Sequence, residues 1–233
     1  MSSKNSSIAD TNDVPVSQPD GKEDVPYHKG QIAERLLAEA RNIMATELVE
    51  DVTARRLCRA VGVTSANFYN HYPNLEYLLL EIAAQEFDRQ HKQNLRILRR
   101  GLSRDDAVLL VTQYCVDFSV RHHQLHRIMY GHVPDSSINP NYMSAADAGM
   151  RTLVHIIYGE DRYDPEDLVK SHESCAKAYA YVAFMSGLAS GISRQIFANP
   201  SGTRAERRNF VETLTRIFLT GLGPEGGTSD RPH

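Results

Sequence analysis

The sequence predicts an all-α protein, because its apolar residues have helical spacing and its polar residues mark helix starts and stops. Apolar side chains recur three and four residues apart, as they do on one face of a helix. The β-prone run at residues 108–111 lies inside a longer helical period. The first apolar stripe consists of Ile32, Leu36, Ala40, Ile43 and Met44.

Four helices are expected in the N-terminal part. The first spans about residues 29–47. Thr53 and Thr64 are each placed to cap a short helix, since a side-chain oxygen can accept from the free N–H groups at a helix start. Asn74 can cap a long helix that covers about residues 75–100.

Four further helices are expected in the C-terminal part. Ser103 and Asp106 form a plausible cap, and Asp164 precedes a proline and two acids, which is a strong start signal. Thr203 and Glu206 resemble a capping box. The expected ranges are about 104–123, 141–158, 165–198 and 204–220.

The composition fits a folded protein with a substantial core and excludes a globally basic nucleic-acid coat. Of 233 residues, 41% are apolar, and the net charge is −3, so any DNA contact must come from a local patch. Cys58, Cys115 and Cys175 show no paired spacing, which favours reduced thiols. No apolar run approaches the ~20 residues of a membrane span, and the N-terminus lacks a signal-peptide core. We therefore expect a cytoplasmic protein without a membrane partner.

The chain divides into four expected segments. Both ends are poor in large apolar residues and so bury too little surface to offset their ordering entropy. The expected segments are disordered tails at 1–26 and 224–233, a small N-terminal domain at 27–74 and a larger helical domain at 75–223.

Residues 53–72 have the pattern of a helix-turn-helix. Val61 ends the buried side of the first short helix, and Gly62 lies where the chain must turn sharply, which favours a residue that tolerates positive φ. In the second short helix, Phe68 and Tyr72 lie four apart on the inner face.

The outer face of this segment suits a DNA major groove. Ser65 and Asn67 are small and hydrogen-bonding, as residues that read base edges are. Residues 52–75 contain three arginines and no acid, a local positive charge that attracts phosphate. Two short surface helices with a solvated arginine face would have the same composition, so the pattern alone leaves both interpretations open.

The same segment resembles the DNA-binding region of the tetracycline-repressor (TetR) family. The resemblance implies an all-α protein with an N-terminal three-helix helix-turn-helix domain joined to a larger helical ligand-binding and dimerisation domain. Residues 27–30 resemble the N-terminal arm of a subgroup of this family. The matching stretches within about residues 30–85 are Thr-Ala-Arg at 53–55, Cys-Arg-Ala-Val-Gly-Val-Thr at 58–64, Tyr-Asn-His-Tyr at 69–72 and Leu-Glu-Tyr-Leu at 75–78.

Two kinds of DNA contact follow from the resemblance. Asn67 is the best candidate for a sequence-specific contact, because asparagine can pair bidentately with adenine. The residues expected to hold phosphates are Thr53, Arg56, Tyr69 and His71. Arg55, Ser65 and Ala66 are expected, with Asn67, to lie closest to the base edges, and Thr64 completes the predicted DNA-binding set.

Three positions depart from the family pattern. Leu75 replaces the usual lysine, which removes one expected phosphate contact, and Arg56 stands where an acid is common and can compensate. Ala66 replaces a common glycine, so the approach to DNA is expected to be slightly less close.

The resemblance also implies that two C-terminal helices pair with a second copy. An intramolecular contact would use the same small residues, but two-fold DNA half-sites favour a homodimer on a palindromic operator. The residues that would let a second helix approach closely are Ala176, Ala180, Ala183, Gly187 and Gly191.

A ligand pocket is implied in the C-terminal domain. Aromatic and methionine side chains suit an adaptable apolar cavity, although at helical spacing they also build ordinary cores. The expected effector is an unidentified hydrophobic or aromatic small molecule. The candidate lining residues are Tyr114, Phe118, Met129, Tyr130, Met143, Met150, Tyr179 and Phe184.

No catalytic site, metal site or cofactor is expected. His122 and His126 lie one helical turn apart, but zinc needs a third or fourth ligand, so a solvated histidine cluster is preferred. The chain has no Gly-x-Ser-x-Gly elbow, phosphate-binding glycine loop or Cys-x-x-Cys motif. The leading hypothesis is therefore a ligand-responsive repressor. The alternatives are a constitutive DNA-binding co-regulator and an all-helical enzyme or metal-binding protein.

Overall fold

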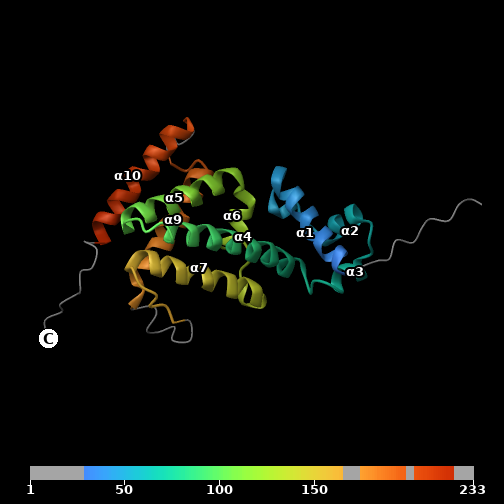
Figure 1. The fold of residues 1–233 in the computed structure, drawn as a ribbon. Helices are drawn as coiled ribbons and strands as arrows, with labels where there is room; N and C mark the ends of the chain where they lie inside the picture. The colour runs from blue at the N-terminus through green and yellow to red at the C-terminus, as the bar shows by residue number, and fades with distance from the viewer. Residues whose placement is uncertain (1–28, 165–173, 198–201, 223–233) are drawn as a thin grey trace, which may run out of the picture.

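The computed structural model describes residues 29–164, 174–197 and 202–222 (Figure 1). Every regular element within these residues is helical, so the all-α prediction is confirmed. The α-helices are α1 (Lys29–Thr46), α2 (Ala54–Val61), α3 (Ser65–Tyr69), α4 (Leu75–Leu98), α5 (Arg104–Arg121), α6 (His123–Met129), α7 (Pro140–Tyr158), α9 (Ala176–Ser193) and α10 (Arg204–Leu222). Two 3₁₀ turns complete the described elements: η1 (Val49–Asp51) lies between α1 and α2, and η2 (Ser136–Ile138) lies between α6 and α7.

Figure 1 shows two groups of helices connected by α4. Helices α1, α2 and α3 lie together at one end, and α4 runs from them into the larger group. There α4 packs along α7, α5 packs along α9, and α10 lies against α5. The long helix α4 therefore belongs to both groups and carries any change in one of them to the other.

Side-chain caps start the helices where the sequence predicts them. Thr53, Thr64 and Asn74 each accept a hydrogen bond from the backbone N–H three residues later, at 3.2, 3.3 and 2.7 Å. Ser103 does the same for α5 at 3.2 Å, and the predicted capping box is present at the start of α10. These caps depend on neighbours in the chain, which is why the sequence reveals them.

The prediction of one helix over 165–198 was wrong at its C-terminal end. Residues 165–173 and 198 lie outside the described part of the chain, and α9 ends at Ser193. Gln195 then has a φ of 56°, and the chain turns so that the Phe197 ring lies over Gly191. The contact between this ring and the glycine favours an early helix end, and no local sequence signal announces it.

Helix α6 was not predicted, since the helix before it was expected to end near residue 123 and to be followed by a loop. The backbone leaves helical geometry at His122, with φ −133° and ψ 53°, and a new seven-residue helix begins. Ile128 and Met129 on α6 are buried. A helix this short has little stability of its own, so these packing contacts stabilise it.

The buried apolar residues form two clusters. In the first, Leu36, Leu57 and Phe68 are fully buried, and the cluster continues through α4 to Met129 of α6. The second joins α5, α7, α9 and α10 around the fully buried Tyr181. The first cluster therefore ties the N-terminal helices to two helices of the larger group.

An ion-pair cluster joins α1 to α4 beside the first core. Glu86 on α4 is only 3% exposed, and both Arg41 of α1 and Arg89 donate to its carboxylate. Arg41 also donates to Gln85 at 2.9 Å. A buried carboxylate is costly without such partners, so the position of α1 against α4 is specified by charge as well as by packing.

A second connection runs from η1 to α6. The backbone N–H of Val49 donates to the side-chain oxygen of the buried Gln124 at 3.1 Å. Arg127 pairs with Glu50 at 2.6 Å and lowers the pKa of that carboxyl to about 2. Helix α6 is therefore bonded to the N-terminal group independently of α4.

We expect Gly62→Ala to destabilise the protein by about 1–2 kcal/mol, because Gly62 has a φ of 78° and this left-handed backbone is costly for an L side chain. No atom lies within 4 Å of the added Cβ, so the cost is one of backbone strain without a clash. The control is Gly149→Ala within α7, where the backbone φ is not positive and the space is also open. That variant should gain about 0.5–1 kcal/mol. Urea unfolding of both variants checks the contrast, and equal stabilities would contradict it.

Candidate nucleic-acid interface

The turn between α2 and α3 has the geometry that the sequence predicts. Gly62 ends α2 in the left-handed region and its N–H bonds to the carbonyl of Cys58. Arg35 of α1 donates to the carbonyl of Val61 at 2.7 Å, which holds the end of α2 against α1. Thr64 then starts α3. The Gly62 turn, the hydrogen bond from Arg35 to Val61 and the Thr64 cap therefore fix the angle between the two short helices.

Two aromatic residues anchor α3 from its inner side. Phe68 is fully buried, and Tyr72 donates its hydroxyl to the carbonyl of Ala33 at 3.2 Å. Burial raises the pKa of Tyr72 to about 12, so the hydroxyl stays protonated and keeps this bond. Tyr69 packs edge-on against Phe68, with ring centroids 5.3 Å apart, while remaining 59% exposed. The anchors leave the opposite face of α3 free.

The structure brings the predicted DNA-binding residues together on α2, α3 and the adjoining turns. Those with exposed side chains are Thr53, Arg55, Thr64, Ser65, Ala66 and Tyr69. Those that are half-buried are Arg56, Asn67 and His71.

Arg56 has a partner that the local sequence did not suggest. Its guanidinium makes two hydrogen bonds to Glu47 near the end of α1, at 2.6 and 2.8 Å. This pairing lowers the pKa of Glu47 and raises the pKa of Arg56. Arg56 was expected to replace a lost phosphate contact, but here its charge is balanced. Arg55 and Arg59 are exposed and make no ion pair with the described residues.

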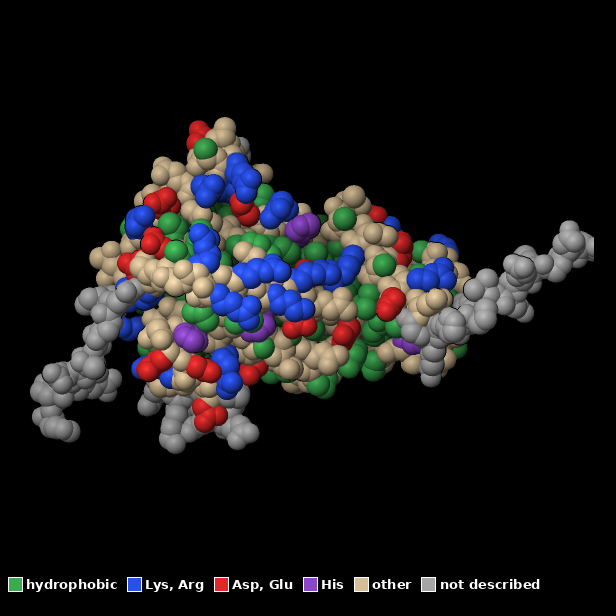
Figure 2. Space-filling model, in the orientation of Figure 1, with side chains coloured by type: hydrophobic (Ala, Val, Ile, Leu, Met, Phe, Trp, Pro, Cys, Tyr) green, Lys and Arg blue, Asp and Glu red, His purple; other side chains and the backbone are tan. Residues whose placement is uncertain are grey.

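A second basic surface lies outside the predicted segment. Figure 2 shows Lys and Arg side chains gathered over α4 and again over the short N-terminal helices. The exposed basic residues here are Arg89, Lys92 and Arg96 of α4 and Arg99 and Arg100 just after it. Beside them, a hollow of about 710 Å³ between α1, α4, α5 and α6 is bordered by Arg41, Arg89, Arg121 and His122.

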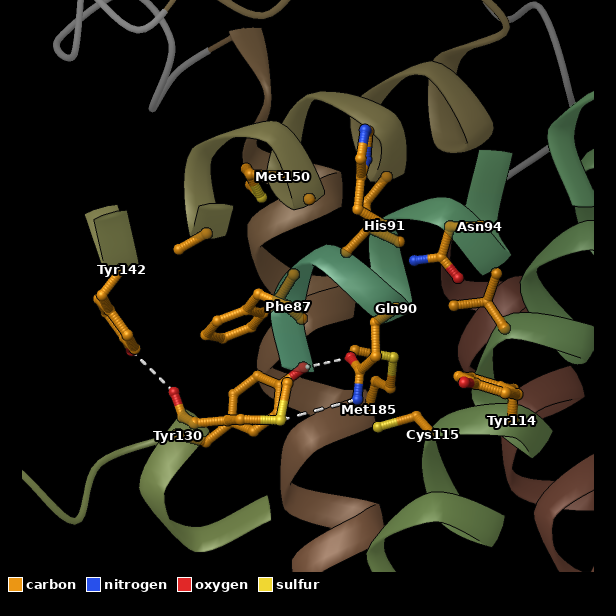
Figure 3. Close-up of a pocket in the computed structure, with 16 residues that line it drawn as sticks. Phe87, Gln90, His91, Asn94, Tyr114, Cys115, Tyr130, Tyr142, Met150 and Met185 are labelled. Carbon is orange, nitrogen blue, oxygen red and sulfur yellow. Dashed lines mark hydrogen bonds between the residues drawn. The ribbon is translucent and has the colours of Figure 1, made fainter. Parts of the chain in front are cut away.

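A cavity of about 250 Å³ lies in the larger helical group, between α4, α5, α6, α7 and α9. Figure 3 shows its side chains converging from all of these helices. The residues that line it include Phe87, Gln90, His91, Asn94, Tyr114, Cys115, Met129, Tyr130, Tyr142, Met150 and Met185.

The predicted ligand-binding residues divide between the cavity and other places. Tyr114, Met129, Tyr130 and Met150 line it. Of the rest, Phe118 borders the hollow between α1, α4, α5 and α6, and Met143 is 47% exposed. Tyr179 packs on the second core, and the Phe184 ring stacks on Phe218 of α10.

Sequence reasoning missed the contribution of α4 to the cavity. Phe87, Gln90, His91 and Asn94 continue the inner stripe that begins with apolar residues nearer the start of the helix. A signal was present, because the polar Gln90 and Asn94 replace apolar residues at positions of the stripe that should be buried. Both are buried in the structure.

In the histidine cluster, His123 and His126 lie on α6 and His122 directly precedes it. The His126 ring lies tilted against the Tyr130 ring with centroids 4.8 Å apart, and its Nε2 is buried without a partner among the described residues. The Nε2 atom of His123 is likewise buried and unpaired there. No group of three or more His, Cys, Asp or Glu side chains that could hold a metal ion is found in the described ranges.

No family model and no curated protein matches the sequence. Among solved structures, a protein of unknown function from Rhodococcus sp. RHA1 has a TM-score of 0.63 at 22% identity, covering 86% of this chain and 100% of that one. A TetR transcriptional regulator from Rhodococcus sp. RHA1 has a TM-score of 0.58 at 14% identity, covering 84% and 100%. RolR, solved in complex with resorcinol, has a TM-score of 0.54 at 15% identity, covering 86% and 98%.

These likenesses show that the chain has the fold of TetR-family transcriptional regulators, an N-terminal helix-turn-helix domain joined to a larger helical domain. The predicted fold is therefore confirmed. Among the described residues, no helix is long and apolar enough to cross a membrane.

We expect the free energy of unfolding to fall as the pH is lowered from about 6.5 to 4, through His126. Burial lowers its pKa to about 4, whereas an unfolded histidine titrates near 6.5. In this window the unfolded chain binds a proton that the native protein does not, so the stability contributed by the neutral ring is lost on acidification.

The loss attributable to His126 between pH 7.5 and pH 5 should be about 2 kcal/mol. Urea unfolding of the wild type and of His126→Leu at the two pH values measures it, with the exposed His122→Leu as the matched control. His126→Leu should show a smaller pH dependence and His122→Leu an unchanged one; the reverse order would contradict the assignment.

Proposed function

We propose that the chain is a sequence-specific DNA-binding transcriptional regulator of the cytoplasm. In this proposal it acts as a homodimeric repressor that a small hydrophobic ligand releases from a palindromic operator. One observation carries the proposal: the Gly62 turn and the buried Phe68 hold α3 so that Ser65, Ala66 and Tyr69 face outwards. The fold shared with TetR regulators supports the same conclusion.

The chemistry of the exposed face supports reading of base edges. Ser65 and Asn67 offer hydrogen-bonding groups without charge, as direct readout in the major groove requires. Arg55 and Arg59 flank them and supply phosphate attraction. Because Glu47 balances Arg56, this attraction comes from fewer charges than the sequence suggests.

The C-terminal helices support a second copy of the chain as the partner. Helices α9 and α10 pack through the stacked rings of Phe184 and Phe218, 4.6 Å apart. Small exposed side chains at Ala180, Ala183 and Gly187 lie on α9, and Ile217 of α10 is 64% exposed. A small-residue stripe beside an exposed isoleucine suits close helix packing. Gly191, from the predicted stripe, is covered by Phe197 within the chain and takes no part.

The cavity supports a ligand-binding role, and RolR, of similar fold, was solved with resorcinol. Helices α4 and α6 both line the cavity and both contact the N-terminal group. Glu86, paired with Arg41, precedes the cavity residue Phe87, and α6 carries Gln124 as well as Met129. A ligand that shifts either helix therefore moves the partners of α1 and η1.

The switch would be a population shift between two arrangements of α4 and α6. Moving such an equilibrium from 1:99 to 99:1 requires about 5.5 kcal/mol of differential ligand affinity. In a homodimer, α3 and its counterpart must meet successive major grooves roughly 34 Å apart, so a small rotation of α4 is enough to lose the operator.

Titration with labelled genomic fragments at several salt concentrations tests DNA binding, and Asn67→Ala tests the reading face. This variant should lose base preference at one position of the site, at a cost of about 1–3 kcal/mol. Arg56→Ala should weaken all sequences alike, because it removes one positive charge and leaves the Glu47 carboxylate without its partner.

Asn42→Ala, an exposed asparagine on α1, is the matched control and should leave both affinity and preference unchanged. An Asn67→Ala protein that keeps the wild-type base preference would show that the reading face is misplaced. Absence of any salt-sensitive, sequence-specific binding by the wild type would refute the regulator.

We expect Ala183→Glu to convert the homodimer to monomer, because the carboxylate would be buried without a partner between two α9 helices. The control is Ser144→Glu, which places the same charge at an exposed position on α7. Sedimentation velocity gives the mass of each species, and operator affinity should fall only for the monomeric variant. A dimeric Ala183→Glu protein would place the interface elsewhere.

A further inference from the structure

Among the described residues, one buried amide that lines the cavity has an oxygen without a hydrogen-bond partner. Asn94 on α4 is 7% exposed, and its Oδ1 makes no hydrogen bond to the described residues. Figure 3 shows the amide nitrogen of Asn94 turned towards the interior, between His91 and Gln90. A buried polar group without a partner costs free energy, so this amide is placed to be satisfied by something that enters the cavity.

The polar groups next to Asn94 already have partners. Gln90 accepts from the hydroxyl of Tyr130 at 3.3 Å and donates to the sulfur of Met129 at 3.9 Å. His91 Nδ1 bonds to the hydroxyl of Thr152 at 2.9 Å. A ligand in the cavity therefore meets a buried amide oxygen of Asn94 that has no partner among the described residues, while Gln90 and His91 are held by Tyr130, Met129 and Thr152.

The lining carries no formal counter-charge for an ion. No Arg, Lys, Asp or Glu is among the described residues that line the cavity. The Cys115 thiol stays neutral, because burial raises its pKa to about 12. An unpaired ion in such surroundings is costly, so the cavity favours an uncharged molecule.

The size and shape of the cavity suggest a substituted ring. A dry cavity of about 150 Å³ accommodates benzene, so by proportion the 250 Å³ here has room for about ten non-hydrogen atoms. Phe87 lies edge-on to both Tyr130 and Tyr142, with centroids 5.4 and 5.5 Å apart. These rings present flat faces and edges that pack well against an aromatic ligand, and methionines fill the remaining gaps.

We propose that the effector is an uncharged aromatic molecule of about ten non-hydrogen atoms whose hydroxyl group binds the Asn94 amide. A hydroxyl can accept from the amide nitrogen and donate to the oxygen at once. A methyl group would leave the amide unpaired, and a carboxylate would bring a charge and no proton for the oxygen. This proposal rests on the proposed function and deepens it, since it names the class of ligand that the regulator senses.

The test compares three probes on the wild-type protein at pH 7 by isothermal titration calorimetry. They are 4-propylphenol, 4-propyltoluene, in which a methyl replaces the hydroxyl, and 4-propylbenzoate, which is an anion. The phenol should bind about tenfold or more tightly than either of the others, because only it satisfies Asn94. This comparison needs no variant, so it stands even if substitutions in the cavity impair folding.

Asn94→Leu should abolish the preference for 4-propylphenol over 4-propyltoluene, because the variant lacks the amide and keeps the volume. Gln93→Leu is the matched control, an amide on the same helix that lines a separate hollow, and it should keep the wild-type preference. Circular dichroism and thermal unfolding of both variants verify that they are folded.

Three outcomes would overturn the proposal: equal affinities for the phenol and the toluene, tightest binding of the benzoate, or no binding of any probe. Tightest binding of the benzoate would assign the ligand to the arginines of the neighbouring hollow instead. Operator binding is measured on the same wild-type sample. If operator binding persists although the probes fail, the ligand class is wrong and the proposed function is kept. If operator binding is absent, the proposed function fails as well.

Discussion

The buried carboxylate of Glu86 is the interaction on which the two halves of this protein depend. It lies on the inner side of α4, and it is held by Arg41 from α1 and by Arg89 from its own helix. A carboxylate this buried keeps its partners, because losing both would leave an ion without compensation. The ion pair between Arg41 and Glu86 therefore helps to fix α1 against α4.

Helix α4 also shows how one amphipathic stripe can serve two purposes. Near its start the inner side chains, such as Leu78 and Ile82, are apolar and complete the core beneath the helix-turn-helix. Further along, Gln90 and Asn94 occupy the same stripe and face the cavity. The change from apolar to polar side chains on one face of a continuous helix places the cavity and the helix-turn-helix on a single helix.

The sequence predicted well where neighbours in the chain determine the structure, and poorly where distant segments do. The caps at Thr53 and Thr64 and the turn at Gly62 depend on backbone groups within a few residues, so they could be read directly. The Glu47 partner of Arg56 and the Phe197 ring over Gly191 come from other elements, and neither was foreseen. The cavity was predicted in part, because several of its aromatic residues were among the candidates whereas its polar residues on α4 were not.

By itself, the sequence determined the all-α class, the helix-turn-helix and the mildly acidic chain with its small arginine-bearing patch. These follow from periodicity, capping and composition, which are local or additive properties. Only the tertiary structure decided which arginines have acidic partners, where α6 forms and which side chains line the cavity, where the Oδ1 of Asn94 has no partner among the described residues. Burial and pairing depend on residues far apart in the chain, and only the packed fold brings those residues together.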